Sequence, residues 1–339
     1  MTRPTIVDIA HRVGVSKGAV SLALNGRPGV STATRARILR AAAEMNWRPH
    51  SAARALSGAR AGAVGLVIAR PAQTIGVEPF FAQILSGLQA TLSAGSIALH
   101  LLVVEDTAAE IDIYRRWTSE RRVDGVVMVD VLARDPRPAV LKQLGVPSVV
   151  LGGPGRHGLP SVWVDDRAAM LSIVDYLVAL GHRRIAHVAG LPGLQHTQRR
   201  MRALRDAADR LESVETVSLP TDYSDTEGAA TTRALLSGPR RPSAIIYDSD
   251  LMAVAGLGVA AEMAVPVPAG LSIVAFDDSV LTRIVHPALT SLSRDTVALG
   301  GQVAGELLAV IADPARARNV QAPTPRLTVR ESTAPPLSS

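Results

Sequence analysis

Hydrophobic positions recur with a helical period in three short segments at the start of the chain. Their apolar faces are expected at Ile6, Ile9, Ala10 and Val13, then at Val20, Ala23 and Leu24, and last at Ile38, Leu39, Ala42 and Met45. Thr5 with Asp8 fits a capping box, Gly14 can end the first helix, and Ser16 and Ser31 can cap the next two. The first two helices and their turn predict a helix-turn-helix, although an ordinary helical hairpin has the same spacing.

From residue 62 the pattern changes to apolar runs that alternate with amphipathic segments. We expect strands at 63–69, 98–104, 125–129, 148–151, 185–189, 215–219, 244–247, 272–276 and 325–329. Helices are expected at 80–92, 111–120, 138–144, 168–180, 199–210, 227–236, 251–263 and 295–311. Repeated β-α units of this length predict two lobes, each an open parallel sheet with helices on both faces. A ligand cleft is expected at the carboxyl ends of the strands.

Residues 48–60 lie between these two patterns. Pro49 can begin a helix and Gly58 can end one. The segment between them is shorter than the roughly 12 residues that an isolated helix needs in water. It is therefore either a helix that forms only when something orders it or a bare linker.

Composition restricts the class of protein. The 339 residues hold no cysteine, which excludes disulfides and thiolate metal sites. No apolar run reaches the roughly 18 residues of a membrane helix, and the N-terminus has no signal-peptide core. We therefore expect a cytoplasmic protein that does not enter a membrane. Aromatic residues make up only 3% of the chain, so aliphatic side chains must fill its cores.

Charge is unevenly distributed. Residues 1–60 hold ten Lys and Arg against two acids, a net charge of +8 in a chain of +6, so the remainder carries −2. A basic segment on a near-neutral body is typical of nucleic-acid binding. An Arg-rich proteome would explain scattered arginines but not their concentration near the start of the chain.

The N-terminal segment resembles the lactose/galactose-repressor family of bacterial transcription regulators. The matching letters are VDIA at 7–10, GVS at 14–16, VS at 20–21 and LN at 24–25, with VRES at 329–332 near the end. Three positions depart from the family pattern: Val13 stands for the usual Ala, Ala19 for Thr, and Leu22 for a frequent Arg. The last of these bears on which DNA sequence is recognised.

The resemblance implies a helix-turn-helix domain at 1–47, a hinge helix at 48–60 and an effector-binding and dimerisation domain at 61–339. The latter is expected to have the fold of periplasmic binding proteins, with two doubly wound parallel sheets. Its first lobe would comprise 62–155 and 294–321, and its second 161–290 and 323–333. The hinge helix of the family folds on operator DNA and inserts a leucine into the minor groove, a position held here by Leu56.

The resemblance also implies which residues contact DNA. Lys17 could donate to a guanine edge in the major groove, where Leu22 can make only apolar contact. Phosphate contacts fix register without reading sequence. The complete expected set is Thr5, Ser16, Lys17, Gly18, Ser21, Leu22, Asn25, Ser31, Thr34, Arg35, His50, Arg54 and Leu56.

Motif alignment with sugar-binding members implies the effector site. Asp277 matches a carboxylate that accepts from ligand hydroxyls, Arg199 a donor, and Tyr223 an aromatic ring that stacks on the ligand. Ser249 stands where the family usually has Asn. Further candidates lie at strand or crossover ends: Arg70, Asp106, Asp130 and Arg294. This combination suits a polyol, because each hydroxyl both donates and accepts; each residue could instead be a solvated loop residue or a helix cap.

Other chemistry has little support. Gly14 to Gly18 match the letters of a hydrolase nucleophile elbow, but a polar-spotted helix precedes them instead of a buried strand. His182 and His187 do not share a face on which one metal could bind. We therefore expect no cofactor, no metal and no enzyme activity. The expected protein is a homodimeric, nucleoid-associated repressor of a palindromic operator, controlled by a small effector, most simply a carbohydrate. A transport-type sugar-binding protein and an enzyme on the same scaffold are the alternatives.

Overall fold

The computed structural model describes residues 4–47, 60–71, 78–154, 158–211 and 213–337. Contacts divide the chain into two compact units, Met1–Ala61 and Gly62–Ser339, each with its own core. Within the described residues no helix is both long and apolar enough to cross a lipid bilayer.

The first unit contains three helices, α1 (Ile6–Val13), α2 (Lys17–Leu24) and α3 (Thr32–Glu44). Their ends follow the predicted caps. Asp8 accepts from the Thr5 N–H and hydroxyl, Gly14 ends α1 with a φ of 70°, and the Ser16 hydroxyl accepts from the Ala19 N–H at 3.2 Å. The core is built from Ile9, Ala10, Val13, Val20, Ala23, Ile38, Ala41 and Ala42, with Trp47 packed against it.

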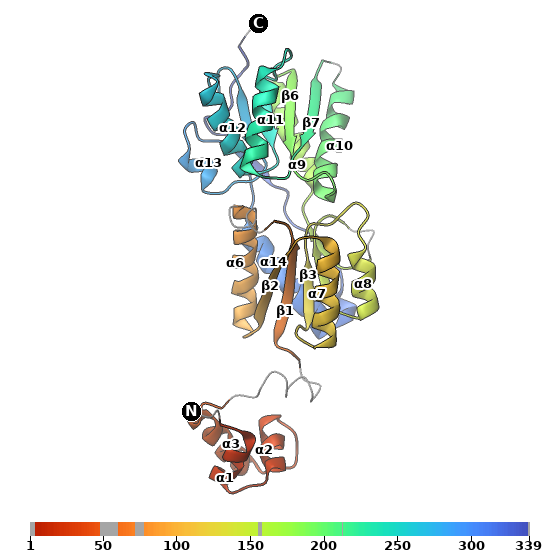
Figure 1. Cartoon of the computed structure of the whole chain (residues 1–339), viewed down its shortest axis with the longest axis vertical. Helices are drawn as coiled ribbons and strands as arrows, with labels where there is room; N and C mark the ends of the chain where they lie inside the picture. The colour runs from red at the N-terminus through yellow and green to blue at the C-terminus, as the bar shows by residue number, and fades with distance from the viewer. Residues whose placement is uncertain (1–3, 48–59, 72–77, 155–157, 212, 338–339) are drawn as a thin grey trace. The chain divides into compact units, whose positions relative to one another are not determined.

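The first lobe of the second unit contains a six-stranded sheet with the strand order β11-β5-β4-β3-β1-β2 (Figure 1). All adjacent strands are parallel. The strands are β1 (Ala63–Ala69), β2 (Ala98–Val104), β3 (Gly125–Met128), β4 (Ser148–Leu151), β5 (Ser161–Trp163) and β11 (Asn319–Gln321).

Helices cover both faces of this sheet. One core lies under α6 (Pro79–Ala94) and α14 (Thr296–Ala312), and the other under α7 (Thr107–Ser119) and α8 (Arg137–Leu144). The first two helices pack closely through glycines: a Cβ on Gly87 would lie 1.9 Å from the Val297 carbonyl oxygen. The short 3-10 helix η1 (Pro314–Arg316) leads from α14 to β11.

The second lobe repeats the plan with the strand order β12-β10-β9-β8-β6-β7. The strands are β6 (Arg184–Ala189), β7 (Glu215–Pro220), β8 (Ala244–Tyr247), β9 (Ser272–Ala275), β10 (Thr290–Ser293) and β12 (Arg326–Thr328). One core lies under α9 (Asp166–Ala179) and α10 (Gln195–Arg210), the other under α11 (Asp225–Ser237) and α12 (Asp250–Glu262). A one-turn helix, α13 (Leu281–Ile284), precedes β10.

The structure confirms every helix and strand predicted from residue 62 onward, with end shifts of a few residues, and it corrects four details. Ser161–Trp163 is a strand of the first sheet, so the first crossing between lobes follows Trp163 instead of preceding residue 161. β5, β10 and β11 were not predicted, because β5 and β11 have three residues each and β10 contains one large apolar residue, Leu292. The last pair, β10 with β12, is antiparallel, so the second sheet is not purely parallel. In the first unit, Leu39 is 48% exposed and does not belong to the apolar face of α3.

Candidate functional site

Several charged residues of the second unit lie where strands of its two sheets end. In each sheet the second strand pairs with one side of the first strand, and the third strand pairs with its other side. The strand order therefore reverses between β1 and β3 and between β6 and β8. Such reversal points leave a crevice beyond the carboxyl ends of the strands. Arg70 follows β1, Asp130 lies just past β3, Asp248 follows β8, Asp277 lies just past β9 and Arg294 follows β10.

These strand ends line a pocket between the lobes with about 680 Å³ of space, part of it open to solvent. Three of the ten aromatic residues of the chain lie in its wall, Phe80, Trp163 and Tyr223. The charged and imidazole side chains in the wall are Arg70, Glu78, Asp130, Asp166, His196, Arg200, Asp248, Asp277 and Arg294.

On the side of the first lobe, Arg70 is shared between two carboxylates. It donates from Nε and NH2 to Asp130 at 2.6 and 2.9 Å, and from NH1 to Glu78 at 3.1 Å. Burial opposes ionisation of Asp130, but Arg70 outweighs it and lowers the pKa of that carboxyl. Glu78 accepts only the hydrogen bond from Arg70 NH1. Burial raises the pKa of the Glu78 carboxyl to about 7. The Arg70 guanidinium also lies 4.8 Å from the ring centre of Tyr223 in the second lobe.

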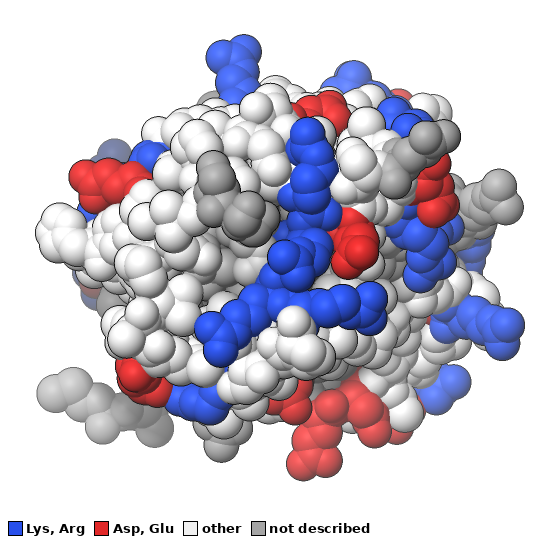
Figure 2. All heavy atoms as spheres, turned by 90° about the horizontal axis from the view of Figure 1, so that it is seen from above, with Lys and Arg blue, Asp and Glu red and all other residues white. Residues whose placement is uncertain are grey.

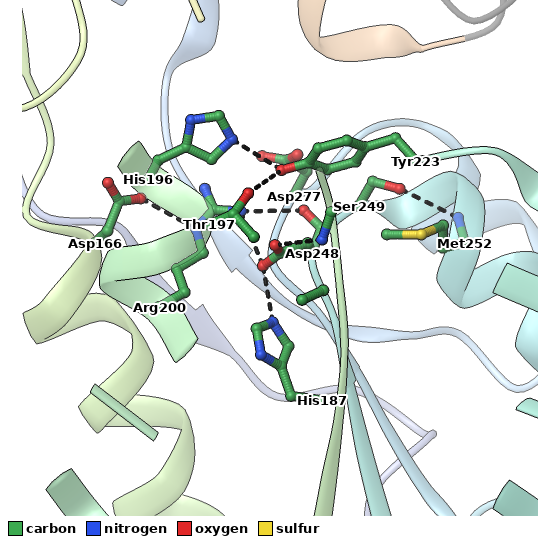
Figure 3. Close-up of polar contacts among 12 residues, drawn as sticks. Asp166, His187, His196, Thr197, Arg200, Tyr223, Asp248, Ser249, Met252 and Asp277 are labelled. Carbon is green, nitrogen blue, oxygen red and sulfur yellow. Dashed lines mark hydrogen bonds and ion pairs between the residues drawn. The ribbon is translucent and has the colours of Figure 1, made fainter. Parts of the chain in front are cut away.

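On the side of the second lobe, Arg200 lies in a network of hydrogen bonds and ion pairs (Figure 3). It donates to Asp166 at 3.1 Å and to Asp248 at 3.0 Å, and its guanidinium stacks 3.7 Å from the ring centre of Phe276. Asp248 also accepts from the Gly190 N–H at 2.8 Å and contacts His187 Nε2 at 3.0 Å. Burial alone would raise the pKa of Asp248, but Arg200 and the hydrogen bonds lower it far below its usual range. This network fixes the floor of the pocket.

Tyr223 is placed by a second set of contacts. Its hydroxyl lies 2.8 Å from His196 Nε2 and 3.3 Å from the Thr197 hydroxyl (Figure 3). Burial lowers the pKa of His196 to about 4, so this imidazole is neutral at pH 7. The backbone of Tyr223 has a φ of 73°, which is unusual for a bulky residue. The ring is thus held in one orientation in the pocket wall.

Asp277 and Asp278, just past the end of β9, have different partners. Asp277 lines the pocket and pairs with Arg294. Asp278 instead accepts two hydrogen bonds from Arg330, both at 2.9 Å. Arg330 also donates to the Leu289 carbonyl, which ties the last segment of the chain to the lobe. Asp278 therefore braces the fold, and Asp277 remains available to the pocket.

Five of the eight expected effector residues lie in the pocket wall: Arg70, Asp130, Tyr223, Asp277 and Arg294. The other three do not. The Asp106 side chain caps α7 by accepting from the Ala109 N–H at 2.8 Å, and the Ser249 hydroxyl caps α12 by accepting from the Met252 N–H at 3.3 Å.

Arg199 bonds to Gln195 Oε1 at 2.8 Å, and its guanidinium packs against Gly153. The next residue, Arg200, is the arginine that reaches the pocket.

The pocket also contains residues that sequence reasoning missed: Glu78, Phe80, Trp163, Asp166, His196, Arg200 and Asp248. Trp163 ends a strand that was not predicted. Asp166 begins α9, and the Asp165 side chain caps that helix. For Asp248 a signal was present, since it follows a buried strand at the reversal point of the sheet, as Arg70 does.

The first unit presents α2 as the candidate nucleic-acid surface. Lys17, Gly18 and Asn25 are exposed, whereas Ser21 and Leu22 are half-buried. Asn25 Nδ2 donates to the Ser21 carbonyl at 2.9 Å, which fixes the end of the helix.

Several of the expected DNA contacts are also helix caps. The Ser31 hydroxyl accepts from the Thr34 N–H, as the Ser16 hydroxyl does from Ala19, and Arg35 donates to the Arg27 carbonyl. Thr5 belongs to the capping box of α1. The expected hinge contacts His50, Arg54 and Leu56 lie outside the described residues.

Among the described residues, no group of three or more His, Asp or Glu side chains is arranged to hold a metal ion. His182 contacts the Ser243 hydroxyl and the Ala334 carbonyl, and His187 contacts Ser218 and Asp248. The two histidines thus have separate structural partners.

Comparison with known proteins agrees with both halves of this description. The family "Bacterial regulatory proteins, lacI family" matches residues 5–50, and "Periplasmic binding protein-like domain" matches residues 174–333. The HTH-type transcriptional regulator CelR of Thermobifida fusca is 32% identical over 309 residues, which are 89% of this chain and 90% of that protein. The regulator MalR of Streptomyces coelicolor is 31% identical over 341 residues, 97% of this chain and 96% of that protein.

Two solved structures extend the comparison. A complex of the transcriptional regulator CelR with cellobiose is 29% identical, with a TM-score of 0.73 over 97% of this chain and 100% of that chain. The lac repressor dimer bound to operator shares the fold, with a TM-score of 0.84 at 23% identity over 98% and 100% of the two chains. The chain belongs to the lacI family of bacterial regulatory proteins, as a transcriptional regulator and not an enzyme.

Proposed function

We propose that this regulator is a repressor whose affinity for a palindromic operator is controlled by a carbohydrate bound in the pocket between the lobes. The observation that carries the proposal is the composition of that pocket. It combines aromatic rings with carboxylates and arginines that lie at the ends of strands from both lobes. A protein with this task works at the nucleoid, in the cytoplasm.

The chemistry of the pocket suits a sugar. A sugar hydroxyl can donate to Asp277 while accepting from an arginine, and the apolar face of a pyranose ring can pack against Phe80, Trp163 or Tyr223. Arg294 Nε is buried without an acceptor in the described residues, so a ligand oxygen would satisfy it. Because both lobes contribute, a bound sugar favours one arrangement of the lobes over others.

One relative indicates which sugars to test first. CelR is solved in complex with cellobiose, and it is 29% identical over nearly the whole chain. We therefore propose a glucose-containing disaccharide as the first class to test, with cellobiose and maltose as its simplest members.

The proposed protein is a homodimer. In the first lobe, β2 is an edge strand with Leu101 39% exposed, and Leu85, Leu99 and Leu101 line a shallow hollow between β2 and α6. In the second lobe, Val280 just before α13 and Ile284 at its end are 54% and 63% exposed. Exposed apolar edge strands invite association, and a second copy would cover these surfaces. A two-fold dimer in turn requires a two-fold operator.

A thermal-shift screen of the full chain against a panel of disaccharides and monosaccharides tests the proposal. A sugar that binds the folded state raises the unfolding temperature by mass action. The sugar so found should then change the affinity of the protein for the DNA upstream of its own gene in a gel shift. If the protein responds to the sugar but binds no DNA, as a transport-type binding protein would, the proposal is contradicted.

A further inference from the structure

A group of arginines lies at the amino ends of the strands of the second lobe, opposite to the pocket. Arg183 and Arg184 are at the start of β6, and Arg240 and Arg241 precede β8. All four side chains are exposed. Figure 2 shows this end of the lobe, with basic side chains gathered across its middle and acidic ones mainly towards the rim.

Strand register brings the two arginine pairs together. β6 and β8 are adjacent and parallel, with Ile185 opposite Ala244. The Ser243 N–H donates to the Arg184 carbonyl at 3.0 Å, so Arg241 is only two residues from a direct backbone contact with Arg184. Two segments about 57 residues apart in sequence thus place four guanidinium groups on one edge.

These arginines have no carboxylate partner in the described part of the chain. None of the four forms an ion pair there, although Glu215 lies opposite Arg184 in the register of β6 and β7. Arg183 donates instead to the carbonyls of Val178 and His182, which orients its side chain over the end of α9. The body outside the first 60 residues carries a net charge of −2, so this concentration of positive charge is local.

A hollow of about 450 Å³, open to solvent, lies beside Arg241. Its wall is formed by Pro242, Ser243, Ala269, Gly270, Pro336 and Leu337. Leu337 is 70% exposed, so apolar surface continues out of the hollow. The face therefore offers a cationic part and an apolar part next to each other.

The mixed character of this face favours a protein partner over a nucleic acid. The planar guanidinium fork of arginine matches a carboxylate with two hydrogen bonds. Single-stranded nucleic-acid sites add exposed aromatic rings for base stacking, and the described residues of this chain contain no exposed Trp, Tyr or Phe. Glu215 also interrupts any continuous track for a phosphate backbone.

We propose that this arginine face binds an acidic segment of another protein, with carboxylates on the arginines and an apolar side chain in the hollow beside Arg241. The hydrogen bonds from Arg183 to the Val178 and His182 carbonyls hold one guanidinium in place, which lowers the entropy cost of binding.

The test uses the full chain and a short fluorescein-labelled peptide made of Asp, Glu and Leu, followed by fluorescence anisotropy at physiological salt. The variant Arg184→Glu/Arg241→Glu reverses charge on the face. The control Arg116→Glu/Arg316→Glu makes the same change of net charge at exposed sites in the first lobe. A second peptide with Asn and Gln in place of the acids measures the apolar contribution alone.

We expect the acidic peptide to bind the wild type and the control variant, and to lose affinity on the order of tenfold or more in the face variant. Operator affinity should be equal in all three proteins, which separates this proposal from the proposed repressor function. Equal peptide affinity in the face and control variants, or no binding to the wild type, would overturn the proposal. Displacement of the peptide by non-operator duplex DNA would also overturn it, because the face would then bind nucleic acid.

Discussion

Arg294 donates from its guanidinium to the carboxylate of Asp277, and this ion pair lies in the wall of the pocket. The two side chains are 12% and 16% exposed, so the pair is largely removed from water but still reachable. Asp277 follows β9 and Arg294 follows β10, and these strands are neighbours in the second sheet. A ligand hydroxyl placed here would meet an acceptor and a donor together, which is what a polyol needs.

Asp277→Asn should lower the affinity for the effector on the order of a hundredfold while operator binding without effector stays at wild-type level. A charged hydrogen-bond partner is lost at the ligand, and its hydroxyls are left partly unpaired. Calorimetry of the sugar and a gel shift of the operator on the same protein measure the two effects.

Asp278→Asn is the matched control, because Asp278 holds Arg330 and does not line the pocket. We expect it to lower the stability of the body, measured by urea unfolding, and to leave the effector affinity of the folded protein nearly unchanged. If Asp277→Asn binds the sugar as the wild type does, the assignment of Asp277 is wrong.

Glu78 should make stability depend on pH. Its pKa rises from the ordinary 4.5 to about 7 on folding. Between these values the folded chain holds a proton that the unfolded chain has released, so stability falls as the pH increases. The loss from this group is on the order of 3 kcal/mol at most, from 1.36 kcal/mol per pKa unit.

Urea unfolding at pH 5, 6 and 7 compares the wild type with Glu78→Gln, which cannot titrate. We expect the wild type to lose more stability than the variant over this range. Parallel pH profiles for the two proteins would show that Glu78 is already ionised in the fold.

Charge on the proposed dimer surfaces should separate the subunits. Leu101→Glu with Ile284→Glu places a carboxylate on each exposed apolar face, where a partner would have to bury it. Light scattering should report a dimer for the wild type and a monomer for the variant. Footprinting should then show a two-fold symmetric site for the wild type and a large loss of operator affinity for the variant. A wild-type protein that is monomeric at full operator occupancy would contradict this prediction.

Leu56→Ala should weaken operator binding by about tenfold or more without changing the stability of the body. In the family, the leucine at this position inserts into the minor groove, where unstacking is offset by the contacts of a bent duplex. Residue 56 precedes Gly62, where the second compact unit begins. Anisotropy with labelled operator and a thermal melt of the same protein measure the two quantities; an unchanged operator affinity would exclude the minor-groove role.

Most of the fold could be predicted because its elements are long and periodic. α14, for example, has 17 residues with an apolar face, and β1 is a continuous apolar run. β5 has only three residues, too few to show an alternating pattern, so its place in the first sheet could not be inferred. It is a strand through its pairing with β4 and with β11, and β11 lies far away in the sequence.

The site could be predicted where a polar residue closely follows a buried strand, as Arg70 follows β1 and Asp277 follows β9. It could not be predicted on helices, where a shift of one position turns a side chain by 100°. Arg199 and Arg200 show this: one packs on Gly153 and the other bonds to Asp166 and Asp248 in the pocket. Sequence spacing alone does not distinguish two adjacent arginines.

The most direct test of the account is the affinity of the full-length protein for its operator, measured by fluorescence anisotropy with and without a saturating concentration of the sugar found in the thermal-shift screen. We predict a change in operator affinity of at least about fivefold, the lower end of usual allosteric coupling, which disappears in Asp277→Asn. If the sugar binds the wild type and the operator affinity stays the same, the pocket does not control DNA binding and the account is contradicted.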